Sequence, residues 1–85
     1  TPEIKIHSED NVKFEVINKV KKYCQSRGYN ILDIDGVKVF FDDGSALVRA
    51  SNTGPNITCR YEAKSENRLN DIQNEFEELL KKLNK

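Results

Sequence analysis

The sequence has no Met and no Trp among its 85 residues, only two Cys and two Pro, and no net charge. No apolar run approaches the roughly eighteen residues that a membrane-spanning helix needs, and no signal peptide is visible. The 14 Lys and Arg balance the 14 Asp and Glu. That balance argues against broad nucleic-acid binding, which needs a basic excess, and against attraction to a membrane surface. The composition therefore predicts neither nucleic acid nor membrane as a partner.

The few cysteines and the single histidine bear on whether a zinc site, a disulfide or a nucleophile is to be expected. Cys24 and Cys59 have no His or Cys neighbours at ligand spacing, so they do not predict a zinc site. Both align with the apolar residues of their own segments, where a free thiol behaves as a small hydrophobe. We expect buried, reduced thiols in a cytoplasmic protein, in preference to a disulfide. His7 has no recognisable nucleophile beside it and is assigned no role.

The absence of an initiator Met bears on the origin of the chain. The chain begins Thr1-Pro2-Glu3, with no Met at position 1. We interpret it as one domain, residues 1–85, excised from the C-terminal end of a longer protein. A chain of this length has room for one modest hydrophobic core.

Hydrophobic periodicity predicts the element order β-α-β-β-β-β-α. Asp10 is the expected N-cap of the first helix, and Gly28 its expected C-terminal stop. Asp35-Gly36 is the strongest signal for a two-residue hairpin turn, and Ser65 is placed to cap the last helix. Strands are expected at residues 3–7, 30–34, 37–41, 45–50 and 57–63, and helices at residues 11–27 and after Ser65.

Two amphipathic helices and a mainly antiparallel sheet indicate the α+β class, with both helices on one face of the sheet. The apolar stripe of the first helix runs through Val12, Val16 and Val20, and Lys13 is placed among the polar residues around it. The opposite face of the sheet is expected to carry Lys5, Lys38, Thr58, Arg60 and Glu62.

Between the last two predicted strands lies the segment Arg49-Ala50-Ser51-Asn52-Thr53-Gly54-Pro55. A guanidinium fits phosphate in bidentate fashion, the short polar side chains add donors, and Gly54 lets backbone N–H groups come close to a ligand. The segment is therefore a candidate anion cradle, for phosphate in particular. The alternative is an ordinary polar connection, because Gly, Asn, Ser and Pro are common turn residues and no general phosphate-binding pattern matches.

Nearly the whole chain resembles the C-terminal domain of the α-D-phosphohexomutases, in particular the phosphomannomutase/phosphoglucomutase branch. The Arg-x-Ser-x-Thr core of the loop is specific when it follows an Asp-Gly hairpin at this distance. The resemblance rests on Thr1-Pro2-Glu3-Ile4, Asp10 with Lys13-Phe14-Glu15-Val16, Asp35-Gly36-Val37-Lys38-Val39, Asp43-Gly44, Leu47-Val48-Arg49-Ala50-Ser51-Asn52-Thr53 and Tyr61-Glu62-Ala63-Lys64-Ser65.

The resemblance implies the last domain of a four-domain enzyme, with a fold similar to TATA-box-binding protein. Such enzymes interconvert hexose 1-phosphate and hexose 6-phosphate through a phosphoserine in the first domain and a bisphosphorylated sugar. A Mg²⁺ site in the second domain and a sugar-binding loop in the third complete the cleft. The last domain binds the phosphate that is not being transferred and closes the cleft, so this piece alone is expected to be inactive. The implied phosphate-binding residues are Arg49, Ser51, Asn52, Thr53 and Gly54.

The resemblance leaves two alternatives. One is a phosphoglucosamine or N-acetylglucosamine-phosphate mutase, which Asn52 disfavours because those enzymes usually carry Gly there. The other is a free-standing nucleic-acid-binding module that uses the open sheet face. Gly54 stands where many relatives have Glu or Thr, so a backbone N–H would replace a side-chain contact. Ser45 replaces a frequent aromatic residue. Arg60 fits an ion pair with a neighbouring acid as well as any functional role.

Overall fold

The computed structural model describes residues 3–33, 36–51 and 54–83. Its elements follow the predicted order, although several ends differ by one or two residues. The predictions that fall on Ile34 and Asp35, and on Asn52 and Thr53 in the candidate loop, lie outside the described residues. The elements are β1 (Ile4–His7), α1 (Lys13–Ser26), β2 (Asn30–Leu32), β3 (Val37–Phe41), β4 (Gly44–Ala50), β5 (Asn56–Ala63) and α2 (Glu66–Leu83).

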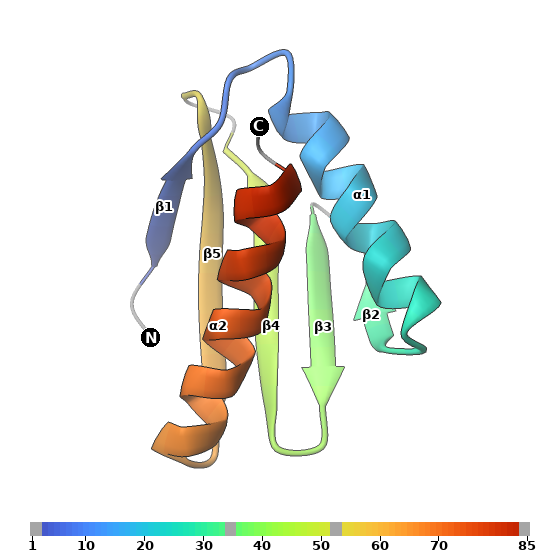
Figure 1. Ribbon diagram of the computed structural model, residues 1–85, viewed down its shortest axis with the longest axis vertical. Helices are drawn as coiled ribbons and strands as arrows, with labels where there is room; N and C mark the ends of the chain where they lie inside the picture. The colour runs from blue at the N-terminus through green and yellow to red at the C-terminus, as the bar shows by residue number, and fades with distance from the viewer. Residues whose placement is uncertain (1–2, 34–35, 52–53, 84–85) are drawn as a thin grey trace.

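The five strands form one sheet in the order β1-β5-β4-β3-β2, and every pairing in it is antiparallel. Both helices cover the same face, with α2 across β4 and β5, and α1 beside it towards β3 and β2 (Figure 1). The predicted α+β class and the placement of the helices are therefore confirmed.

The core lies between the helices and the covered face of the sheet. Each helix supplies one stripe: Val16, Val20 and Cys24 from α1, and Ile72, Phe76 and Leu80 from α2, all buried. These spacings keep each stripe on one side of its helix. The strands alternate, so every second residue points into the core. The buried strand residues are Val37, Val39, Ala46, Val48, Ile57, Cys59 and Tyr61.

The opposite face of the sheet carries the residues predicted for it. Lys38 pairs across the strands with Leu47, and Leu47 with Arg60, so all three project from the uncovered side. Thr58 belongs to this face but is buried, with Lys5 and Arg49 as its register partners. Phe40 is 44% exposed there. The candidate loop thus continues from strands with one apolar and one polar face.

The start of α1 corrects one prediction. Asp10 is not the N-cap, because the helix begins at Lys13, after Val12, and no side chain caps it. The backbone N–H groups of Val12 and Lys13 both donate to the carbonyl oxygen of Glu9, at 2.9 Å each. A backbone turn thus satisfies the donors that a capping side chain would otherwise bind. The Asp10 carboxylate instead pairs with the Lys13 ammonium at 2.9 Å.

The other element ends are mostly as expected. Gly28 has φ +73 just after α1, the left-handed conformation that favours glycine. The Ser65 hydroxyl accepts a hydrogen bond from the backbone N–H of Arg68 at 3.2 Å, as a cap of α2 would. The β2–β3 connection differs from the prediction. β2 ends at Leu32 and β3 begins at Val37, so residues 33–36 connect them, and the turn predicted at Asp35-Gly36 lies partly outside the described residues.

Candidate functional site

The candidate loop joins β4, which ends at Ala50, to β5, which begins at Asn56. It lies at the same end of the sheet as the start of α1 (Figure 1). The connection before β3 belongs to this end too, because Gly36 contacts the backbone of Arg49. Three connections that are far apart in the sequence therefore meet here. Of the predicted site residues, the structure describes Arg49, Ser51 and Gly54.

Arg49 is the penultimate residue of β4 and is exposed. Its neighbours Val48 and Ala46 point into the core, so the alternation of the strand places Arg49 on the uncovered face. Across the sheet it pairs with Thr58, which is 4% exposed. The guanidinium is thus carried by a sheet strand at the edge of the loop and is not enclosed in the core.

Lys13, the first residue of α1, contacts the loop directly. Its side chain is only 6% exposed. The Nζ atom donates to the carbonyl oxygens of Ser51 at 2.6 Å and of Gly54 at 2.9 Å. The same ammonium pairs with Asp10, so it has three oxygen partners. Because an ammonium has three N–H donors, this set can satisfy all of them.

Lys13 is the residue that the sequence analysis misplaced. It was predicted among the polar residues around α1, yet it is buried. A signal was present: Lys13 lies three residues before Val16 and seven before Val20, which is the spacing of the buried stripe itself. The residue type, lysine, argued for the surface, because lysine is almost never fully buried unless it is paired.

Backbone hydrogen bonds hold the rest of the described loop. The N–H of Ser51 donates to the carbonyl oxygen of Asn56 at 2.9 Å, and the N–H of Asn56 donates to that of Gly54 at 2.8 Å. The buried Ser8, just after β1, donates its N–H to the carbonyl oxygen of Pro55 at 2.7 Å. The carbonyl oxygens of Ser51, Gly54 and Pro55 are thus all engaged by the protein itself.

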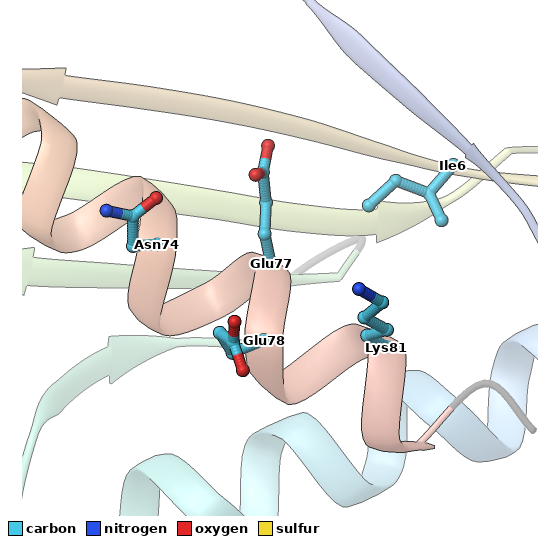
Figure 2. Close-up of a pocket in the computed structure, with 5 residues that line it drawn as sticks. All are labelled: Ile6, Asn74, Glu77, Glu78 and Lys81. Atoms are coloured by element: carbon cyan, nitrogen blue, oxygen red, sulfur yellow. The ribbon is translucent and has the colours of Figure 1, made fainter.

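A separate hollow of about 450 Å³ lies between β1 and α2. Figure 2 shows Ile6 on one side and Asn74, Glu77, Glu78 and Lys81 on the helix. Two carboxylates against one ammonium make this hollow unfavourable for an anion. None of the described loop residues, 49–51, 54 and 55, lines it. The described residues of the loop therefore lie outside this hollow, and the phosphate site stays a prediction.

Other candidate chemistries find little support among the described residues. Over residues 3–33, 36–51 and 54–83, no three His, Cys, Asp or Glu side chains gather as metal ligands would. Within those same ranges, neither helix has the length and apolar character needed to cross a bilayer. Arg60 lies 3.9 Å from the Glu62 carboxylate, and both side chains are largely exposed. That ion pair is the one expected as the alternative to a functional role.

Comparison with known proteins identifies the family of the chain. Residues 3–79 match the family model for the phosphoglucomutase/phosphomannomutase C-terminal domain. A phosphomannomutase/phosphoglucomutase of Pseudomonas syringae pv. tomato is 42% identical over 83 residues, which is 98% of this chain and 18% of that protein. A phosphoglucomutase of Neisseria meningitidis serogroup B is 37% identical over 82 residues, 94% of this chain and 18% of the relative.

A solved structure agrees as well. The crystal structure of a phosphoglucomutase/phosphomannomutase family protein from Burkholderia thailandensis superposes with a TM-score of 0.77 at 33% identity. The match covers 98% of this chain and 17% of that one. This chain thus spans less than a fifth of the length of these relatives. From the family match and the shared fold, the chain belongs to the phosphoglucomutase/phosphomannomutase family and corresponds to its C-terminal domain.

Proposed function

We propose that this chain is the C-terminal domain of a phosphomannomutase/phosphoglucomutase that interconverts hexose 1-phosphate and hexose 6-phosphate. In that enzyme the domain binds the phosphate that is not being transferred. The observation that carries the proposal is the exposed Arg49 at the edge of a loop in which the carbonyl oxygens of Ser51, Gly54 and Pro55 accept hydrogen bonds from the protein itself. The family membership supplies the substrate class.

Each proposed contact has a distinct physical role. Arg49 supplies a permanent positive charge and a planar pair of donors that fits two phosphate oxygens. Ser51 and Thr53 supply hydroxyl donors, and Asn52 an amide donor. Gly54 has no side chain, so a phosphate can approach the backbone closely. Together these groups recognise a tetrahedral anion and make no contact that requires a particular sugar carbon.

Phosphate binding that does not depend on the sugar carbon suits a reaction that runs through a bisphosphorylated sugar. The sugar must be held in two orientations, with either the 1-phosphate or the 6-phosphate in the loop. A rigid set of donors that reads only phosphate geometry accepts both. When the domain closes over the substrate, it also excludes water, which would otherwise hydrolyse the phosphorylated intermediates.

As the family resemblance implies, the proposal places the Mg²⁺ site of such an enzyme in another domain. There it would stabilise negative charge on the phosphoryl group that moves. This chain contributes phosphate binding and cleft closure, and catalysis belongs to the remaining domains. The chain alone is therefore expected to bind substrate without turning it over.

The affinity of the isolated chain should be weak. Charge-assisted hydrogen bonds contribute on the order of 1.5–3 kcal/mol each. Association costs at least about 4 kcal/mol. Three or four contacts on an open surface then leave roughly 3–5 kcal/mol, which corresponds to dissociation constants around millimolar.

A titration followed by heteronuclear NMR tests the proposal. Glucose 1-phosphate added to the ¹⁵N-labelled chain should shift the backbone amide signals of Arg49, Ser51 and Gly54 and saturate in the millimolar range. Unphosphorylated glucose is the matched ligand control and should shift none of them. Arg49→Ala should remove the response, whereas Arg27→Ala, at the far end of α1, should leave it intact.

Two results would contradict the proposal. The loop signals could remain unchanged at saturating glucose 1-phosphate while another surface responds. Alternatively, a salt-dependent gel shift with mixed-sequence DNA would favour the nucleic-acid module that the sequence left open. A separate experiment addresses the mutase alternatives. Comparing glucose 1-phosphate with glucosamine 1-phosphate as substrates of the complete enzyme would distinguish a phosphoglucomutase from a phosphoglucosamine mutase.

A further inference from the structure

We propose that Lys13 is a positioning residue for the phosphate loop, the segment of residues 49–55. Its ammonium holds the carbonyl oxygens of Ser51 and Gly54 against the start of α1, so that these two oxygens are turned away from the ligand. This inference rests on the proposed function, since it concerns the same loop. No contact between Lys13 and the phosphate is part of it.

The first argument is geometric. Lys13 bonds Ser51 at 2.6 Å and Gly54 at 2.9 Å, and these two residues bracket the centre of the loop. Its partners are 38 and 41 residues away in sequence. One side chain therefore fastens both ends of the short segment that carries the predicted hydroxyl and amide donors. A residue on α1 thereby sets the geometry of a loop between β4 and β5.

The second argument concerns burial. An ammonium is expensive to bury unless it is paired and hydrogen-bonded. Lys13 is 6% exposed and has Asp10, Ser51 and Gly54 as oxygen partners. Such a group tolerates few other positions, because moving it away from any partner leaves a charge or a carbonyl poorly solvated. The contact thus acts as a stiff constraint on the loop.

The third argument is electrostatic. Carbonyl oxygens carry partial negative charge and repel a phosphate, so an anion-binding loop must turn them away from its ligand. Lys13 accounts for two of these oxygens and places a positive charge behind the loop. Its acidic partner Asp10 is 74% exposed, so solvent screens the Asp10 charge more strongly than the buried ammonium. Because the Asp10 charge is screened more strongly than the Lys13 charge, the pair together favours an anion at the loop.

The test compares Lys13→Met with Lys19→Met in the full chain. Methionine keeps the length of the side chain and removes its charge and donors. Lys19 lies on the same helix, is half exposed and pairs with Glu15 at 3.7 Å, so Lys19→Met is the matched control. Circular dichroism establishes that each variant is folded at the temperature used. The probes are inorganic phosphate and glucose 1-phosphate.

Lys13→Met should weaken phosphate binding at least about tenfold and speed amide exchange of Ser51, whose N–H is bonded to Asn56, by a similar factor. Lys19→Met should change neither quantity more than about twofold. A purely structural lysine would lower the melting temperature and leave both quantities unchanged in the folded variant. That result overturns the inference.

The unmodified chain provides a second measurement if Lys13→Met does not fold. Scalar couplings across hydrogen bonds should connect the Lys13 Nζ with the carbonyl carbons of Ser51 and Gly54. On phosphate binding, the Nζ signal and both carbonyl signals should shift together. Missing couplings, or a silent Nζ signal at saturation, overturn the inference. If the unmodified chain binds no phosphate at all, the proposed function is overturned instead. That measurement does not use the Lys13→Met variant, so the two failures can be distinguished.

Discussion

The backbone of Gly36 lies directly against that of Arg49. A Cβ atom added to Gly36 would stand 2.5 Å from the Arg49 Cβ and 2.9 Å from its Cα. Gly36 also has φ +114, a conformation that side chains rarely adopt. The connection before β3 therefore packs against β4, the strand that carries the proposed phosphate-binding Arg49. Only glycine at position 36 allows the two backbones to come this close.

Gly36→Ala should therefore damage both stability and binding. Backbone strain and overpacking each cost about 1–3 kcal/mol, so we expect a loss of roughly 3 kcal/mol or more in the free energy of unfolding. Phosphate binding at Arg49 should weaken with it. Urea denaturation and the phosphate titration measure the two effects.

Gly28→Ala is the matched control. Gly28 also has positive φ, at +73, but nothing lies within 4 Å of an added Cβ. Gly28→Ala should lower the free energy of unfolding only by the cost of placing a side chain in a left-handed backbone conformation, about 1–2 kcal/mol. Phosphate binding should be unchanged. Equal losses in the two variants would show that the contact with Arg49 is unimportant.

If the complete protein is the phosphomutase that we propose, Arg49→Ala in it should lower kcat/KM for glucose 1-phosphate. Loss of charge-assisted hydrogen bonds worth about 1.5–3 kcal/mol corresponds to a decrease of roughly 10- to 150-fold. Formation of the phosphoserine should persist, because the proposal assigns it to another domain. Steady-state kinetics and intact-mass measurement of the phosphoenzyme test the two halves. An unchanged KM would count against the assigned role.

The cysteines offer a test of the core. Burial raises the pKa of the Cys24 and Cys59 thiols to about 11 each. Both are free and buried, as predicted. Because the thiolate is the reactive form, neither should react with a thiol reagent at mildly alkaline pH in the folded chain. Both should react once urea unfolds it. Rapid labelling of either thiol in the native state would contradict the packing described above.

Tyr23 makes stability depend on alkaline pH. Burial, followed by its hydrogen bond to the Glu75 carboxylate at 2.9 Å, raises the pKa of Tyr23 to about 12 from 10.0. The Tyr29 hydroxyl donates to the same carboxylate oxygen, and its pKa is raised too, first by burial. The folded pKa lies above the unfolded one, so the contribution to stability is complete below pH 10 and is lost as pH rises towards 12.

Glu75→Gln removes the negative charge beside both hydroxyls. It should lower the pKa of Tyr23 and move the onset of tyrosinate absorbance to lower pH. Glu78→Gln, an exposed glutamate on the same helix, is the control and should leave the titration unchanged. Urea unfolding at several alkaline pH values measures the stability. A titration in which the Glu75 variant matches the unmodified chain would show that burial alone sets this pKa.

Core positions could be predicted from the sequence, whereas contacts between distant segments could not. Val37 and Val39, or Ile72 and Phe76, could be placed in the core because strand and helix periods select one face. Asp10 was misassigned because an acid before a helix has two uses, a cap or an ion pair, and sequence spacing alone does not distinguish them. Lys13 was missed because its partners, Ser51 and Gly54, lie in another part of the chain.

The amino-acid pattern by itself determined the element order, the class, the buried stripes and the family, because periodicity and local motifs are properties of neighbouring residues. Only the tertiary structure decided that Lys13 fastens the loop, that Gly36 packs on Arg49 and that Ser8 bonds to Pro55. The physical reason is that each contact joins segments from different elements. Their meeting depends on how the helices and the sheet pack together, which no local spacing records.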